Sequence, residues 1–123
     1  MIELVSDLGG GKTTFVKGIA RGIGSDDVVT SPTFTLNNVY TGTTLQLHHF
    51  DFYRLSEPGI MREELAEVLH DPKIVTVVEW AGVVHDVLPT DKLTIRITAT
   101  GETSRQLELT ATGAAVSIIK DLR

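Results

Sequence analysis

The sequence predicts an α/β fold, with a mixed sheet that has a parallel core and antiparallel hairpin additions. Two observations support this prediction. A glycine-rich stretch, SDLGGGKTT at residues 6–14, separates a short apolar run from a segment with helical periodicity. Strand-like and helix-like patterns then follow one another in the order strand, helix, two strands, helix, strand and two strands. A length of 123 residues suits one hydrophobic core, so we expect residues 1–123 to form a single domain.

The first two predicted elements flank the glycines. Residues 2–5 form a short apolar run that ends at the glycine-rich stretch, which predicts a strand. Apolar residues recur at helical spacing behind Lys12, and these are Phe15, Val16, Ile19, Ala20 and Ile23. Gly22 and Gly24 supply the end of this helix.

A hairpin follows the first helix. Ser31-Pro32 marks a turn, and residues 33–40 and 44–51 then have the composition of two strands. The intervening Thr-Gly-Thr at 41–43 is short enough to join these strands directly, so we expect them to pair in antiparallel fashion.

The second half of the chain begins with a helix and a buried strand. Residues 56–59 open a helix that runs to His70, and its inward-facing residues are Met61, Leu65, Val68 and Leu69. Asp71-Pro72 ends it. Residues 74–78 are apolar with little alternation, which predicts a strand that is buried on both faces.

A second hairpin and a tail complete the chain. Residues 93–99 and 107–111 alternate apolar and polar side chains, and Gly-Glu-Thr at 101–103 joins them. For residues 114–123 we expect either a short C-terminal helix or a tail.

Composition excludes several classes of function. The net charge of −5 argues against a domain that holds nucleic acid by its own electrostatics, although a partner could still supply that contact. The absence of cysteine excludes disulfides, thiol chemistry and cysteine zinc sites. The first residues are too short and too acidic for a signal sequence, and no apolar run approaches a membrane span. We therefore expect a cytoplasmic protein.

The glycine-rich stretch fits the end of the phosphate-binding pattern G-x-x-x-x-G-K-[ST], which predicts a P-loop NTPase-like site. Glycines let backbone N–H groups converge on phosphate oxygens, and the following helix directs its positive end at them. In this pattern Lys12 reaches the phosphates and the hydroxyl of Thr13 ligates Mg²⁺. The residues expected around the nucleotide are Leu8, Gly9, Gly10, Gly11, Lys12, Thr13 and Thr14.

One position departs from the pattern, because Ser6 stands where the first glycine is usual. We expect some backbone strain there rather than loss of the site. The alternative interpretation is a flexible glycine turn before a helix, with Lys12 in solvent, and the flanking strand and helix argue against it.

Two acidic residues lie at the carboxyl ends of predicted strands, where open α/β sheets place their ligands. Glu79 follows a run in which four of five residues are apolar, which makes it the better candidate for the metal side of the site. Asp51 would then orient or deprotonate an attacking water. For each acid the alternative role is a cap or a simple ion pair.

The segment HHFDFY places three polar residues on one face of its strand. Period-two geometry puts His49, Asp51 and Tyr53 on that face and Phe50 and Phe52 on the other. A proton-shuttle role for His49 is open, but a hydrogen bond to the neighbouring acid is favoured.

Two further residues keep alternative roles. Arg54 either stabilises developing phosphate charge or forms a surface ion pair. Trp80, the only tryptophan, lies either near the nucleotide or in the core, and the core is favoured for a single tryptophan.

Four motifs in this order and spacing resemble the TsaE (YjeE) family of small bacterial ATPases. They are DLGGGKTTFVKGIARGIG, SPTFTL, HFDFYRL and VVEWA, and the resemblance extends to about Gly113. It implies an ATPase needed to make threonylcarbamoyladenosine in tRNA, which works with the TsaD and TsaB proteins. It also implies that TsaD carries out the transfer, while ATP hydrolysis resets the complex between turnovers.

The resemblance also implies roles for individual residues. Lys12 and Asp51 would be the catalytic residues, with Asp51 the essential acid. Thr13 and Glu79 would lie on the Mg²⁺ side of bound ATP or ADP, with Trp80 beside the nucleotide. Residues 31–35 correspond to a mobile segment that senses the nucleotide.

One difference from the family concerns the N-terminus. Family members carry a further segment before the first strand, part of which helps to hold the adenine, whereas this chain starts on that strand. The difference suggests a fragment or a start assigned too late, and it predicts weaker adenine binding and unpaired backbone groups in the sheet.

Three functions follow from these features. The first is an ATP hydrolase that supports tRNA modification and turns over slowly without its partners, because no second arginine-bearing domain closes the site. The second is a small-molecule kinase, although the chain has no room for a lid and an acceptor domain. The third is a nucleotide-dependent assembly module without hydrolysis, in which binding alone switches residues 31–35. We expect no membrane or disulfide partner.

Overall fold

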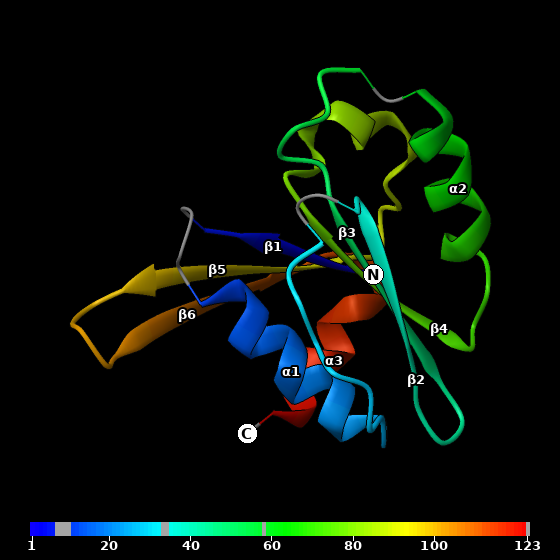
Figure 1. Ribbon diagram of the computed structural model, residues 1–123. Coiled ribbons are helices and arrows are strands. Elements are labelled where there is room, and N and C mark those ends of the chain that lie inside the picture. The colour runs from blue at the N-terminus through cyan, green and yellow to red at the C-terminus, as the bar shows by residue number, and fades with distance from the viewer. Residues whose placement is uncertain (7–10, 33–34, 58, 123) are drawn as a thin grey trace.

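A six-stranded mixed sheet with helices on both faces organises the molecule (Figure 1). The computed structural model describes residues 1–6, 11–32, 35–57 and 59–122. The elements are β1 (Ile2–Val5), α1 (Lys12–Gly22), β2 (Asn37–Thr41), β3 (Gln46–Asp51), α2 (Gly59–Leu69), β4 (Ile74–Glu79), η1 (Ala81–Val87), β5 (Leu93–Ala99), β6 (Arg105–Ala111), η2 (Gly113–Ala115) and α3 (Val116–Asp121). The predicted α/β fold is confirmed.

The strand order is β2-β3-β4-β1-β5-β6. Strands β3, β4, β1 and β5 are parallel, while β2 and β6 pair antiparallel at the two edges. This is the predicted parallel core with a hairpin added at each side. Strand β1 pairs with β4 on one side and β5 on the other, so among the described strands unpaired backbone groups belong to the edges β2 and β6.

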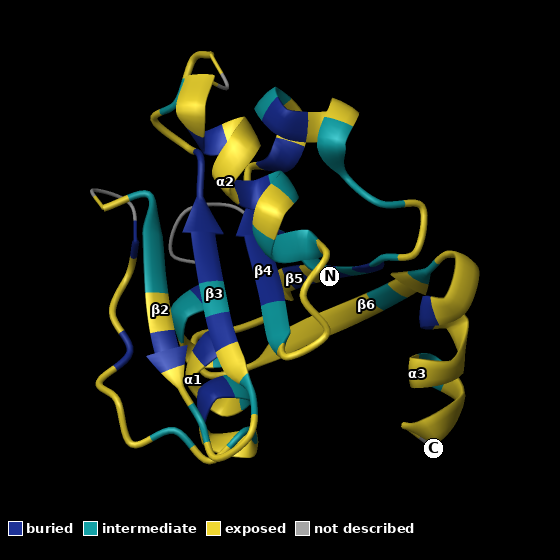
Figure 2. Cartoon of the chain, turned by 90° about the vertical axis from the view of Figure 1, so that its right-hand side faces the viewer, coloured by how far each residue is buried: buried dark blue, intermediate teal, exposed yellow. Residues whose placement is uncertain are grey.

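Helices cover the two faces of the sheet unequally. On one face α1 and α3 pack over a cluster of apolar side chains, among them Leu4, Val16, Ala20, Leu47, Val77 and Ile95. On the other face α2 and η1 cover a second cluster, among them Phe50, Phe52, Met61, Leu65, Val78 and Val84. Burial is concentrated on β3 and β4, whereas β6 and α3 are largely exposed (Figure 2).

Alternation along the strands sorts side chains as the sequence predicts. Phe50 and Phe52 lie in the α2-side cluster, while Leu47 lies under α1. In β4, Val77 and Val78 enter opposite clusters, so this strand is buried on both faces as expected.

Some element bounds differ from the prediction, and one element was missed. Strand β2 begins only at Asn37, because the backbone of Leu36 has a φ of 66° and cannot continue an extended strand into it. Helix α2 begins at Gly59 rather than Ser56. The 3₁₀ segment η1 was missed because seven residues are too few to show a helical period. The tail contains α3, preceded by the short turn η2.

The sheet topology determines where the predicted site residues meet. Strands β3 and β4 run side by side with Asp51 opposite Glu79, and Leu4 of β1 also lies opposite Glu79. The carboxyl ends of the three strands therefore lie together at one end of the sheet, beside the start of α1. Within the described ranges, no helix is both long and apolar enough to cross a bilayer.

Candidate functional site

The site begins at the N-terminus of α1. Gly11 caps the helix with a left-handed φ of 99°, which favours glycine, and its carbonyl accepts the first helical hydrogen bond from Phe15 N at 3.0 Å. The first turn carries no acidic residue, so the positive end of the helix is not neutralised by its own side chains. Thr13 is half-buried in this turn, and Thr14 is exposed. The predicted phosphate residues Leu8, Gly9 and Gly10 lie outside the described residues.

Lys12 is buried and turned towards the end of β4. Its Nζ lies 3.3 Å from Glu79 Oε1 and 3.4 Å from the carbonyl oxygen of Ser6, which accepts from it. The same Nζ lies 5.1 Å from the centre of the Trp80 ring, within the range of a cation–π contact. The alternative that left Lys12 in solvent is therefore wrong.

Ser6 does not show the strain that was expected of it. Among the described residues other than glycine, only Leu36 and Trp80 have a positive φ. Ser6 thus occupies the first position of the pattern in a backbone conformation that its β-carbon tolerates.

Glu79 is buried and has a partner for each carboxylate oxygen. Oε1 faces Lys12, and Oε2 accepts a hydrogen bond from Nε2 of the fully buried His49. We expected His49 to bond the acid of its own strand, Asp51, and this prediction was wrong. His49 lies opposite Val77, so the side chain two residues further along β4, which is Glu79, is its diagonal neighbour on the same face.

Asp51 lies beside Glu79 and is 3% exposed. Its Oδ1 accepts a hydrogen bond from the backbone N of Tyr53 at 2.9 Å, which holds the carboxylate at the end of β3. Two carboxylates and one ammonium thus lie together at the carboxyl ends of β3 and β4. Arg54 is exposed just beyond this point.

Trp80 lies at the mouth of the site rather than in the core, so the favoured prediction for it was wrong. It is 40% exposed, and its ring centre is 4.9 Å from that of Tyr53. A left-handed φ of 56° turns the chain sharply after Glu79 and brings the indole over Lys12. The family resemblance implies that Trp80 lies beside the nucleotide, and that role stays a prediction.

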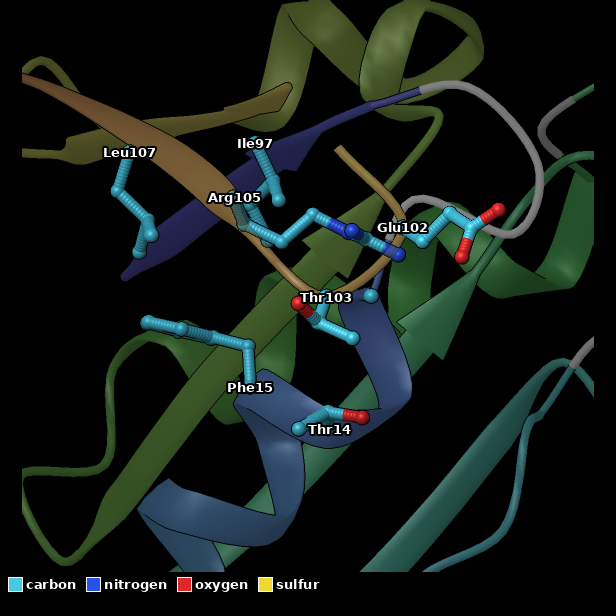
Figure 3. A pocket seen from close by; sticks show the side chains of 8 residues that line it. Thr14, Phe15, Ile97, Glu102, Thr103, Arg105 and Leu107 are labelled. Carbon is cyan, nitrogen blue, oxygen red and sulfur yellow. The ribbon is translucent and has the colours of Figure 1, made fainter. Parts of the chain in front are cut away.

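A cavity of about 360 Å³ adjoins the first turn of α1. Its walls are Gly11, Thr14, Phe15, Ile97, Glu102, Thr103, Arg105 and Leu107. Figure 3 shows Thr14 and Phe15 on the α1 side, with Ile97, Arg105 and Leu107 contributed by β5 and β6. Arg105 Nε lies 3.6 Å from the position that a β-carbon on Gly11 would take.

Sequence reasoning missed the hairpin residues of this cavity. Glu102, Thr103 and Arg105 belong to a turn and an edge strand, and nothing in their local pattern distinguishes them from other exposed polar residues. Only the pairing of β1 with β5 brings their hairpin beside Gly11.

The expected nucleotide-sensing segment is tied to β2 at both ends. Asn38 Nδ2 donates to the carbonyl oxygen of Thr30 at 3.2 Å, and Asn38 Oδ1 accepts from Thr35 Oγ1 at 2.9 Å. Thr33 and Phe34, inside the segment, lie outside the described residues. Asn38 thus contacts both described flanks of residues 31–35, and the hydroxyl of Tyr40 also bonds the backbone of Thr30.

The oxygen atoms at this end of the sheet suit Mg²⁺, rather than a metal whose ligands are all protein side chains. In the described part of the chain, no three His, Cys, Asp or Glu side chains gather as a metal cage. The buried carboxylate of Glu79 nevertheless already faces a cation, the ammonium of Lys12. One carboxylate and the Thr13 hydroxyl suit Mg²⁺, which keeps waters and takes its other ligands from phosphates.

Comparisons with known proteins agree with this geometry. Residues 1–107 match the family model described as "Threonylcarbamoyl adenosine biosynthesis protein TsaE". The "tRNA threonylcarbamoyladenosine biosynthesis protein TsaE" of Bacillus subtilis (strain 168) is 40% identical over 115 residues, covering 92% of this chain and 70% of that protein. The protein of the same name from Streptomyces coelicolor is 37% identical, covering 92% of this chain and 79% of that protein. The crystal structure of Bacillus subtilis YdiB matches with a TM-score of 0.76 and 34% identity, covering 98% of this chain and 74% of that chain.

The buried pair at the site should contribute more to stability than an exposed pair elsewhere. Glu79→Ala leaves the buried ammonium of Lys12 without its carboxylate, so we expect a loss of about 3–5 kcal/mol in the free energy of unfolding. The matched control is Asp86→Ala, which breaks the half-exposed pair with Arg62 and should cost less than about 1 kcal/mol. Urea unfolding measures both, and equal losses would contradict the prediction.

Proposed function

This chain belongs to the TsaE family of threonylcarbamoyl adenosine biosynthesis proteins, and we propose that it acts there as a P-loop ATPase that binds and hydrolyses Mg-ATP. The single observation that supports this activity best is the buried contact of Lys12 with Glu79 at the N-terminus of α1. It joins the lysine of a phosphate-binding pattern to an acid at the end of a parallel strand. These are the two groups that such a site must bring together.

Lys12 has to change partners when a nucleotide binds. Its ammonium faces Glu79 and the ring of Trp80, and a triphosphate at the start of α1 offers it a stronger anionic partner. The lysine side chain is long and flexible, so this change needs no movement of the helix. The capping Gly11 and the positive end of α1 are already directed at the same place.

The two acids then have separate tasks. Thr13 and Glu79 would hold Mg²⁺, which supplies neutralisation of charge on the phosphate oxygens when it is bound. Asp51 would orient a water for attack on the terminal phosphorus and accept its proton, while the bond to the ADP oxygen breaks. The hydrogen bond from Tyr53 N to Asp51 Oδ1 directs the carboxylate for this task.

The cavity beside Thr14 is the natural place for adenosine. It adjoins the phosphate end of α1, and its volume lies within the usual range for small-molecule sites. Phe15, Ile97 and Leu107 supply apolar surface for a base, and Arg105 lies next to Gly11. The β5–β6 hairpin would thus contact the nucleoside half of ATP.

The partners follow from the family. We propose that the chain works with the TsaD and TsaB proteins in the cytoplasm, where ATP hydrolysis resets their complex between rounds of tRNA modification. A net charge of −5 favours indirect contact with tRNA, through these partners. Turnover of the isolated chain should be slow, because full transition-state stabilisation needs an arginine that a partner can supply.

A nucleotide-dependent assembly module without hydrolysis is the second candidate. The observation in its favour is the attachment of residues 30 and 35 to β2 through Asn38. A segment held at both ends can respond to bound nucleotide without any chemical step. The fate of Asp51 variants separates this candidate from the first.

Calorimetry with Mg-ATP tests the proposal. Lys12→Ala should weaken binding about 10-fold to 100-fold, since a hydrogen bond to a charged group contributes roughly 1.5–3 kcal/mol. Lys17→Ala, an exposed lysine on the same helix, is the control and should bind normally. Asp51→Asn should keep binding but lose hydrolysis by about 10²–10⁴-fold, measured as phosphate release in the presence of TsaD and TsaB. Undiminished modification over many rounds by Asp51→Asn would favour the assembly module.

Replacing Glu79 separates its effect on the lysine from its effect on the metal. Without Mg²⁺, Glu79→Gln should bind ATP more tightly, by roughly 10-fold or about 1.4 kcal/mol, because the charge that competes for Lys12 is gone. The gain in affinity that Mg²⁺ gives to the parent protein should shrink in this variant.

The control for this experiment is Glu3→Gln. Glu3 is also partly buried and paired with a lysine, Lys92 at 2.9 Å, but its pair is formed away from α1. Glu3→Gln should leave the affinity for ATP unchanged, both without and with Mg²⁺. Weaker ATP binding by Glu79→Gln in the absence of metal would show that Glu79 does not restrain Lys12.

A further inference from the structure

His49 is a fully buried imidazole whose only partner in the described residues is the acid of the site. We propose that His49 is a positioning residue, which fixes the carboxylate of Glu79 when Lys12 leaves it for a phosphate. The inference rests on the proposed function, because it concerns the metal side of a Mg-ATP site.

The contact determines which nitrogen carries the proton. The carboxylate of Glu79 only accepts hydrogen bonds, so Nε2 of His49 must be the donor to Oε2. The other carboxylate oxygen, Oε1, faces Lys12 at 3.3 Å. Each oxygen of Glu79 therefore has its own partner, one on β3 and one on α1.

The two partners differ in their freedom to move. Lys12 has a long side chain and a reason to leave, since a triphosphate competes for its ammonium. His49 has a short side chain at the centre of a parallel strand, opposite Val77, and is 0% exposed. After Lys12 moves, the bond from His49 still fixes Oε2 and leaves Oε1 directed at the site. A metal-side carboxylate that is held in this way does not have to be oriented when the metal arrives.

The second nitrogen of His49 supports a single, local task. Nδ1 is buried without a hydrogen-bond partner among the described residues, which carries a cost in free energy. An apolar side chain would fill this space without that cost, so packing alone does not account for a histidine here. Because Nδ1 has no partner among the described residues, the hydrogen bonds do not continue beyond His49. Positioning Glu79 therefore needs only Nε2.

This reasoning defines the variants. Glutamine places its amide nitrogen about where Nε2 lies, whereas asparagine is one carbon shorter and places it nearer Nδ1. His49→Gln should therefore preserve the contact with Glu79, while His49→Asn and His49→Leu should lose it.

His48 provides the matched control. It is the adjacent imidazole on the same strand, but it faces the α2 side, with its ring centre 6.3 Å from that of Phe50. Burial lowers the pKa of His48, and the nearby carboxylate of Asp71 opposes this shift in part. His48→Gln changes an imidazole to an amide one residue away, without touching Glu79.

The experiment is a calorimetric titration of each folded variant with ATP over a series of Mg²⁺ concentrations. Circular dichroism first establishes which variants fold. For His49→Leu and His49→Asn we expect the Mg²⁺ concentration that gives half of the gain in affinity to rise about 10-fold to 100-fold. Affinity for ATP without metal should stay within about twofold of the parent in all variants, and His49→Gln and His48→Gln should follow the parent throughout.

The outcomes separate this inference from the proposed function. A parent protein whose ATP affinity does not respond to Mg²⁺ would overturn both. A normal response in the parent and an equal one in His49→Leu would overturn the positioning role alone. The positioning role would also be overturned if the Mg²⁺ response of His49→Gln were as impaired as that of His49→Asn. Packing of the side chain, rather than the hydrogen bond from Nε2, would then account for the effect. If His49→Leu does not fold, the glutamine and asparagine variants still decide the question.

Discussion

The buried contact between Lys12 and Glu79 is the interaction on which the rest of the site depends. Each charge alone would be costly at this depth, and each offsets part of the cost of burying the other. The pair also explains why a nucleotide and its metal should bind together. In the proposed function a phosphate would take the ammonium and leave Glu79 with its hydrogen bond from His49 but without a cation, unless a second cation arrives with the phosphate. Mg-ATP would bring both partners at once, so that neither buried charge would be left without compensation.

The sheet makes this contact possible, because β1 lies between β4 and β5. Helix α1 follows β1 in the sequence, and Leu4 of β1 is opposite Glu79 of β4. The lysine at the start of α1 is thus delivered to the end of β4. Strand β3, on the far side of β4, adds His49, which bonds Glu79, and Asp51, which lies opposite Glu79.

Local patterns in the sequence were enough for most of the helices and strands, and for placing the two acids at the ends of β3 and β4. An apolar repeat of two residues identifies strands and one of about 3.6 residues identifies helices. An acid that follows an apolar strand marks the carboxyl end of that strand. The partner of His49 was not predictable, because it depends on the register between β3 and β4, to which no local pattern refers. The position of Arg105 beside Gly11 was not predictable for the same reason, because it depends on the pairing of β5 with β1, which brings a hairpin that is distant in sequence to the start of α1.

Backbone strain is placed where the two acids must be directed. Leu36 and Trp80 are the non-glycine residues with positive φ in the described part of the chain, and such a conformation costs about 1–2 kcal/mol. The carbonyl of Leu36 accepts from Asp51 N at 3.0 Å, and Trp80 directly follows Glu79. Each acid therefore has a strained residue as its immediate neighbour. At Trp80 the strain is compensated by the contacts of its ring with Lys12 and Tyr53, which exist only because the chain turns there. A glycine at this position would relax the backbone and remove the cover from the lysine, so the strain belongs to the site rather than to the fold.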